Sequence, residues 1–279
     1  MMFGRERLET KTRDQVRAMR APGLVVGQCL AMLRDAAQPG VTTLELDTLA
    51  ERFIRDHGGR PSFAEVPGYR HTLCTSVNEE IVHGIPRETR VLAAGDLLSI
   101  DCGAIVDDWH GDAAISLIVG GREAARPEDL QLLDATEESL WAGIAAMRVG
   151  RDLFEVGAAI EKSIVASGKE HDRVFGIVED YVGHGIGREM HMSPNVPNYA
   201  VRGKGPVVKN AATVAIEPMI TLGEEANETL ADQWTVVTRD RMRACHWEHT
   251  VACHDGGIWV LTALDGGAAR LGTAYAPLD

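Results

Sequence analysis

The sequence lacks long apolar runs and any excess of basic residues, and both absences narrow the class of protein. No apolar stretch in its 279 residues approaches the roughly 18–20 residues that span a bilayer, so we expect no membrane partner. The segment Met1–Arg7 has no apolar core of a secretory signal. A formal charge of −13 argues against a nucleic-acid partner, which would require a basic stripe.

The sequence also lacks paired cysteine motifs. Its five cysteines are scattered without C-x-x-C spacing, which favours reduced thiols and a cytoplasmic protein. A content of 45% hydrophobic and 25% charged residues is typical of an ordinary globular chain. No stretch has the composition of an inter-domain linker, so we expect one catalytic domain over residues 1–279.

What is present is a repeated order of helices followed by strands. Apolar spacing predicts helices in the first sixty residues, with a break or kink at Pro22-Gly23. Thr42 and Glu45 form a capping box that opens a helix ending near His57. A second helical block and a second strand block follow, at about 127–147, 152–167, 213–217, 234–238, 247–253 and 257–262. Helices before strands, twice over, favour an α+β fold with antiparallel sheet.

Two aspartates lie in stretches that read as neighbouring strands. Asp101 lies in the apolar run 97–103, and Asp112 precedes the apolar run 113–119. If the chain turns near residues 106–107, the two side chains lie directly opposite each other, with Cβ atoms about 4.5–5.5 Å apart. Two buried carboxylates that face each other need a proton or a cation between them. We favour a metal.

A glycine-rich turn, Gly183–Gly187, carries His184. By itself this pattern is similar to a dinucleotide-binding loop, but that loop requires a helix to follow. Pro194 and Pro197 come next in this chain and cannot continue a helix. We therefore expect the glycines to let the backbone pass close to a site, into which His184 and His191 project.

Two glutamates complete the candidate site. Glu217 ends the apolar strand 213–217, where an ionised side chain calls for a partner or a metal. Strand alternation directs Glu248 to one side of the sheet, and Trp247 and His249 to the other. We therefore exclude His249 from the site.

Together, four carboxylates and one imidazole form an oxygen-rich ligand set: Asp101, Asp112, His184, Glu217 and Glu248. Such a set can hold two divalent ions roughly 3.5–4 Å apart, bridged by shared carboxylates. Oxygen-rich ligation with one histidine suits Mn, Fe or Co better than a structural zinc site. The sequence does not rank these three metals.

Six short stretches match one known family: Ser76–Pro86, Ser99–Gly103, His110–Asp112, Gly183–Gly187, Ile216–Met219 and Glu248–Thr250. On these motifs the chain resembles the bacterial type I methionine aminopeptidases, from about residue 12 to 265. The resemblance implies the pita-bread fold, in which two pseudo-symmetric halves of antiparallel sheet and flanking helices enclose a dinuclear metal site. It also implies a monomeric hydrolase that removes the initiator methionine from nascent proteins. The ribosome is a candidate partner, although no segment of the sequence supports that contact.

The resemblance assigns the metal ligands to individual roles. It implies that Asp101 binds one ion, that Asp112 and Glu248 bridge both, and that His184 and Glu217 complete the other. Water activated by the metals would attack the scissile carbonyl, and Glu217 would also relay its proton.

The resemblance further assigns the substrate contacts. His191 would steady the carbonyl oxygen, and His83 would contact the scissile amide nitrogen. Tyr69, Cys74 and Trp234 would form the methionine pocket, whose aromatic and soft surfaces suit a thioether.

Two positions depart from the commonest bacterial pattern of this family. Met190 stands where phenylalanine is usual, and Val66 stands where an aromatic residue is common. Neither position belongs to the metal ligands, so both departures concern the boundary of the pocket.

Two other classes of protein remain as alternatives. A proline-specific aminopeptidase of the same fold shares all five ligand types, but such enzymes usually carry an additional N-terminal domain, and only some 70 residues precede Cys74. A metal-free or catalytically inactive relative would have lost ligands, whereas this chain retains each of them.

Overall fold

The computed structural model describes residues 8–278. Residues 1–7, in which the sequence predicts no secretory signal, and residue 279 lie outside the described residues. The helices are α1 (Arg13–Ala36), α2 (Thr43–Asp56), α3 (Pro127–Ala146), α4 (Phe154–Glu170) and α5 (Ala268–Leu271), with 3₁₀ turns at Phe63–Glu65, Arg122–Ala124 and Gly272–Ala274. Within residues 8–278, no helix combines the length and the apolar character needed to cross a membrane.

The strands form antiparallel sheets, which confirms the α+β prediction. The strands are β1 (Arg60–Pro61), β2 (Leu73–Val77), β3 (Glu80–Val82), β4 (Leu97–Val106), β5 (Trp109–Ile118), β6 (Gly176–Ile177), β7 (Gly183–Gly185), β8 (Met192–Val196), β9 (Ala212–Ile216), β10 (Met219–Thr221), β11 (Asn227–Thr229), β12 (Val236–Thr238), β13 (Ala244–His246), β14 (His249–His254) and β15 (Gly257–Val260). One larger sheet runs β1-β4-β2 with β5 paired to β4, and the other runs β15-β14-β9-β7-β8. Two small sheets, β13-β10-β6 and β11-β12-β3, accompany them.

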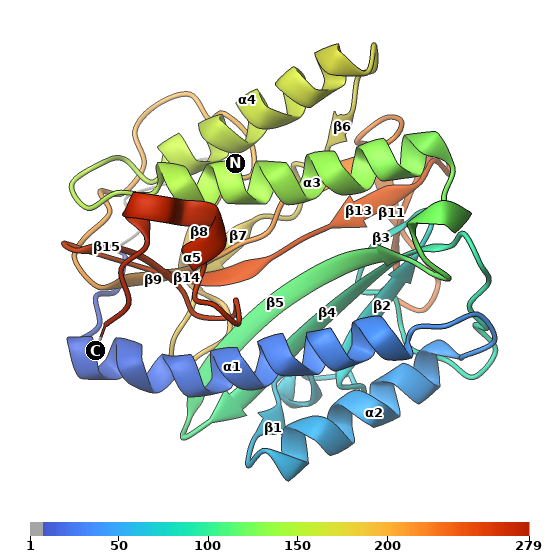
Figure 1. Ribbon diagram of the computed structural model, residues 1–279, viewed down its shortest axis with the longest axis horizontal. Coiled ribbons are helices and arrows are strands. Elements are labelled where there is room, and N and C mark those ends of the chain that lie inside the picture. Colours follow the sequence, from blue (N-terminus) through green and yellow to red (C-terminus); the bar gives the residue numbers. More distant parts are fainter. Residues whose placement is uncertain (1–7, 279) are drawn as a thin grey trace.

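Two helices precede each of the larger sheets. Figure 1 shows α1 and α2 on one side of the molecule and α3 and α4 on the other, with the β4–β5 hairpin and β14 between them. This arrangement places the site-bearing strands at the centre of the fold.

Helix α1 runs without a break through Pro22, so of the predicted break or kink at Pro22-Gly23 the break is wrong. A proline inside a helix costs about 3 kcal/mol, and packing offsets that cost here. On the core-facing side of α1, Val16, Met19 and Val26 are fully buried. The backbone also passes close to its neighbours at Gly23, where a Cβ atom would lie 2.2 Å from the carbonyl oxygen of Leu261.

Helix α2 begins as the sequence predicts. Thr42 is its N-cap, with the Glu45 backbone N–H donating to the Thr42 hydroxyl and the Thr42 backbone N–H donating to the Glu45 carboxylate. This reciprocal pair satisfies two of the free N–H groups of the first turn.

The β4–β5 hairpin has a different register from the one predicted. Asp107 and Asp108 both adopt positive φ and make a two-residue turn, so Asp101 pairs with Ala114, and Gly103 pairs with Asp112. Asp101 and Asp112 are therefore diagonal neighbours, roughly 7–8 Å apart, and the prediction that they face each other directly is wrong. Because partners in an antiparallel ladder share one face, both carboxylates still point to the same side.

Reciprocal backbone hydrogen bonds join the two larger sheets at Ala114 and Glu248. Glu248 N donates to Ala114 O at 2.9 Å, and Ala114 N donates to Glu248 O at 3.3 Å. This pair joins β5 to the residue that precedes β14, so Glu248 lies at the seam between the two halves of the fold.

Candidate active site and metal centre

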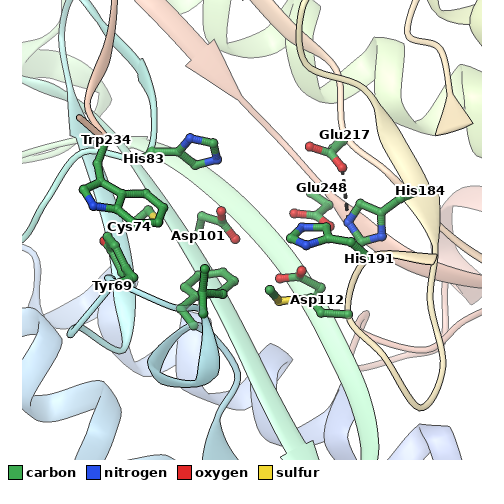
Figure 2. Close-up of a pocket in the computed structure, with 13 residues that line it drawn as sticks. Tyr69, Cys74, His83, Asp101, Asp112, His184, His191, Glu217, Trp234 and Glu248 are labelled. Atoms are coloured by element: carbon green, nitrogen blue, oxygen red, sulfur yellow. Dashed lines mark ion pairs between the residues drawn. The ribbon is translucent and has the colours of Figure 1, made fainter. Parts of the chain in front are cut away.

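A cavity of about 160 Å³ lies at this seam. A cavity for a single water molecule needs only about 10–15 Å³, so this cavity can hold an amino-acid side chain. Figure 2 shows the residues around it. Its lining includes each of the ten site residues named from the sequence: Tyr69, Cys74, His83, Asp101, Asp112, His184, His191, Glu217, Trp234 and Glu248. Phe63, Val66 and Met190 complete the lining.

Sheet register sets several of these side chains in a row. Cys74 on β2 pairs with Asp101 on β4, which pairs with Ala114 on β5. Ala114 in turn exchanges two backbone hydrogen bonds with Glu248. The row therefore runs from a sulfur-bearing side chain through one carboxylate to another, across the seam of the two sheets.

Glycines position His184 close to the neighbouring strands. A Cβ atom on Gly183 would lie 2.3 Å from Ala215 O, and one on Gly185 would lie 2.4 Å from Ser193 O, so neither position tolerates a side chain. His184 Nδ1 lies 2.9 Å from Gly185 O. Donation of the Nδ1 proton to that carbonyl leaves the Nε2 lone pair free for a metal.

The pairing of β9 with β14 places Glu217 and Glu248. The β9–β14 pairing ends at Ile216 with His249, and Glu217 and Glu248 are the next residues of the two segments. The Glu217 Oε1 atom lies 3.5 Å from His184 Nε2. Consistent with strand alternation, His249 points away: its Nδ1 contacts the Thr262 hydroxyl at 2.8 Å, and its ring packs on Trp141.

Burial changes the protonation of the four carboxyl groups. Desolvation raises the pKa of Asp101 to about 7. Desolvation together with the charges of neighbouring carboxylates raises the pKa values of Asp112, Glu217 and Glu248 well above their usual range. So many buried carboxylates remain ionised at neutral pH only beside a positive charge.

The donor set fits a divalent metal. Asp101 Oδ1, Asp112 Oδ1 and Glu248 Oε1 are buried without a hydrogen-bond partner. Ligand atoms of Asp112, His184 and Glu248 lie within 4.8 Å of one another. Buried oxygens without partners are costly, and coordination of a cation would satisfy them.

Two further histidines line the cavity. His83 has a φ of 58°, an uncommon backbone conformation that recurs at functional sites, and its ring lies edge-on to Tyr181. The His191 ring centroid lies 4.5 Å from that of His184. Burial lowers the pKa of His83 to about 4 and also lowers the pKa of His191, so both are neutral at pH 7.

The other wall of the cavity is apolar. The Tyr69 and Trp234 rings meet edge-on with centroids 5.0 Å apart, and the Tyr69 hydroxyl donates to Leu73 O at 2.7 Å. Cys74 is buried, and desolvation raises the pKa of its thiol well above the usual range. This wall therefore presents rings and a neutral sulfur.

Two residues at or beside the site were missed in the sequence. Phe63 lines the cavity from a 3₁₀ turn in a segment interpreted only as a loop. His246 precedes Glu248 by two residues and is buried, and burial lowers its pKa to about 3. Strand alternation would have placed His246 on the same face as Glu248.

The comparisons with known proteins agree with this geometry. Residues 17–255 match the model of "Metallopeptidase family M24". Methionine aminopeptidase 1 of Mycobacterium tuberculosis is 49% identical over 259 residues, covering 93% of this chain and 96% of its own. Methionine aminopeptidase 1 of Bacillus subtilis is 41% identical, covering 90% of this chain and 98% of its own.

Solved structures give the same result. The crystal structure of methionine aminopeptidase from Thermotoga maritima has a TM-score of 0.86 and 35% identity, covering 92% of this chain and all of its own. Prolidase from Pyrococcus furiosus has a TM-score of 0.68 and 18% identity, a likeness of fold alone. These neighbours confirm the predicted pita-bread fold, and the chain belongs to metallopeptidase family M24, in its methionine aminopeptidase branch.

Proposed function

We propose that this protein removes the initiator methionine from nascent polypeptides and prefers a small second residue. The convergence of orphaned carboxylate oxygens and an apolar slot in one cavity carries this proposal. The relatives with 41–49% identity that are named methionine aminopeptidase support it. We also propose that residues 1–279 act as one catalytic domain, as a monomer in the cytoplasm.

As a member of a metallopeptidase family, the protein uses divalent metal. We propose two ions of Co, Mn or Fe. Five side chains of the polar wall would hold them: Asp101, Asp112, His184, Glu217 and Glu248. Bound ions of this kind polarise a carbonyl group and make water nucleophilic near neutral pH.

The remaining chemistry belongs to this chain's own side chains. Glu217, whose carboxylate lies at the edge of the metal-ligand cluster, would accept the proton of the attacking water and pass it to the leaving amine. His191 would donate to the carbonyl oxygen as negative charge develops there, and His83 would contact the scissile amide nitrogen. Because both imidazoles are neutral, each can donate a hydrogen bond without adding positive charge near the metals.

Substrate position would follow from the two walls of the cavity. A methionine side chain would lie between Tyr69, Cys74 and Trp234, with its α-amino group and carbonyl directed to the carboxylates. The runner-up, an Xaa-Pro aminopeptidase-like activity, rests on the shared fold with prolidase at 18% identity. No residue on the cavity wall favours it.

The decisive experiment compares peptide substrates on metal-reconstituted protein. We expect rapid cleavage of Met-Ala and Met-Gly peptides, slow cleavage of Met-Trp peptides and none of Ala-Pro peptides. Chelation should abolish the activity, and Mn, Fe or Co should restore it. Full activity in metal-free protein, or preference for proline in second place by orders of magnitude, would overturn the proposal.

A further inference from the structure

A buried histidine beside Glu217 has no place in the proposed mechanism. His246 ends β13 and is only 2% exposed, and its Nε2 atom has no hydrogen-bond partner. An orphaned polar atom in the interior forfeits its solvation without compensation. Such an atom in a native fold calls for an explanation.

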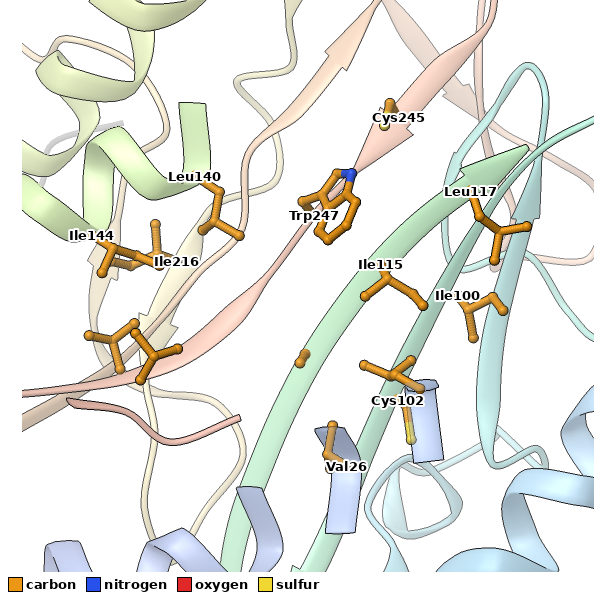
Figure 3. Packing of buried hydrophobic residues seen from close by; sticks show 14 of the residues in the cluster. Val26, Ile100, Cys102, Ile115, Leu117, Leu140, Ile144, Ile216, Cys245 and Trp247 are labelled. Carbon is orange, nitrogen blue, oxygen red and sulfur yellow. The ribbon is translucent and has the colours of Figure 1, made fainter. Parts of the chain in front are cut away.

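Strand alternation turns His246 toward the cavity side. Its neighbours Cys245 and Trp247 belong to the apolar core, as Figure 3 shows. His246 Nε2 lies 4.0 Å from Glu217 Oε2, whereas His184 Nε2 lies 3.5 Å from Glu217 Oε1. The Glu217 carboxylate is therefore flanked by an imidazole on each oxygen.

The backbone of His246 is fixed by hydroxyl groups of the central hairpin. Its N–H donates to Ser99 Oγ and Ser116 Oγ, each at 3.3 Å, and Ser116 Oγ donates to His246 O at 2.7 Å. His246 also pairs with Met219, two residues after Glu217. The imidazole of His246 and the carboxylate of Glu217 therefore lie on segments that are joined by the pairing of β10 with β13.

We propose that His246 is a positioning residue, whose imidazole donates from Nε2–H to Glu217 Oε2 and holds that carboxylate in its metal-binding orientation. The present separation exceeds the 2.7–3.2 Å of a direct hydrogen bond. The proposal therefore requires a rotation about the terminal torsion of Glu217, which is soft in glutamate, to close this separation. This inference rests on the proposed function, because it takes Glu217 as a metal ligand and proton carrier.

The test compares variants of His246 in the full-length protein. His246→Leu and His246→Met remove the donor, whereas His246→Gln retains an N–H group. Calorimetric titration with Mn²⁺ gives metal affinity, and a Met-Ala peptide gives kcat and KM. Groups that orient metal ligands typically contribute 10–100-fold to affinity or activity. We expect losses of about that size in Mn²⁺ affinity and kcat for the Leu and Met variants, with KM unchanged and His246→Gln within a few-fold of wild type.

His249→Leu is the matched control, because it removes a buried imidazole from the same segment that faces away from the cavity. Its Mn²⁺ affinity should equal that of wild type. The positioning role would be overturned if His246→Leu or His246→Met kept the Mn²⁺ affinity and kcat of wild type. It would also be overturned if His246→Gln, or the control His249→Leu, lost as much as the Leu and Met variants of His246. If wild-type protein binds Mn²⁺ but does not cleave the peptide, the proposed function fails while the Mn²⁺ comparison still decides this inference.

Discussion

One wall of the cavity is built from four carboxylates and three imidazoles, whereas the opposite wall is built from Tyr69, Cys74 and Trp234 (Figure 2). On the first wall, buried oxygens lack hydrogen-bond partners, so their burial costs the fold part of its stability. On the second wall, the Tyr69 hydroxyl is satisfied and the rings pack on each other, so burial is favourable. The contrast indicates that the polar wall is retained for chemistry and the apolar wall for selection of the substrate.

The largest effect should come from loss of Asp112 or Glu248, which the resemblance to the family assigns to both metal ions. Asp112→Asn or Glu248→Gln should abolish binding of both ions and lower kcat by more than the 10²–10⁴ typical of a single acid–base group. Without metal, the same variants should melt at a higher temperature than wild type at neutral pH, because the amide replaces a buried carboxyl group whose raised pKa forces it to take up a proton on folding. Elemental analysis, peptide kinetics and thermal unfolding measure the three quantities.

A buried carboxylate with partners provides the control for that prediction. Asp129 is fully buried between Arg126 and Arg243, and Asp129→Asn should lower the melting temperature while metal content stays normal. If Asp112→Asn also lowers the melting temperature of the metal-free protein, the contrast between the two walls is wrong.

The second effect separates substrate contacts from metal ligands within the polar wall. His83→Ala and His191→Ala should retain the metal content of wild type, while kcat falls by about 10²–10⁴. Elemental analysis beside steady-state kinetics distinguishes the two roles. Loss of one ion in either variant would make that histidine a ligand.

A smaller effect should appear when the apolar wall is probed with altered substrates. Hydrophobic pockets discriminate by only about 1–3 kcal/mol per methylene, so a peptide beginning with norleucine should be cleaved slowly but measurably. Trp234→Ala should narrow the difference in kcat/KM between methionine and norleucine and leave metal affinity unchanged. An equal loss for both substrates would show that Trp234 has no part in selection.

The smallest effect concerns the edge of the pocket, where Met190 and Val66 line the cavity. Met190→Phe replaces a flexible side chain by a ring of similar volume, a change that usually costs less than about 1.5 kcal/mol. We expect a few-fold sharper preference for methionine over norleucine and for alanine over larger second residues, measured as kcat/KM ratios. Unchanged ratios would remove Met190 from the selectivity of the site.

Local patterns in the sequence predicted most of the elements and the membership of the site. The capping box at Thr42 and Glu45 opens α2 as expected, and alternation correctly directs His249 away from the cavity. Each predicted site residue lines the cavity. Strand alternation and the glycine turn indicated the metal-ligand set and His191, whereas Tyr69, Cys74, His83 and Trp234 came from the resemblance to the family. These patterns act over a few residues, which is why they can be interpreted without a structure.

Tertiary structure alone decided how these pieces meet. The continuity of α1 through Pro22 depends on burial against the sheet, which local propensity does not contain. The diagonal placement of Asp101 and Asp112 depends on a turn formed by Asp107 and Asp108. The approach of His246, at the end of β13, to Glu217, just before β10, depends on the pairing of these two strands. Contacts between segments distant in the chain leave no local pattern, so only the folded molecule contains them.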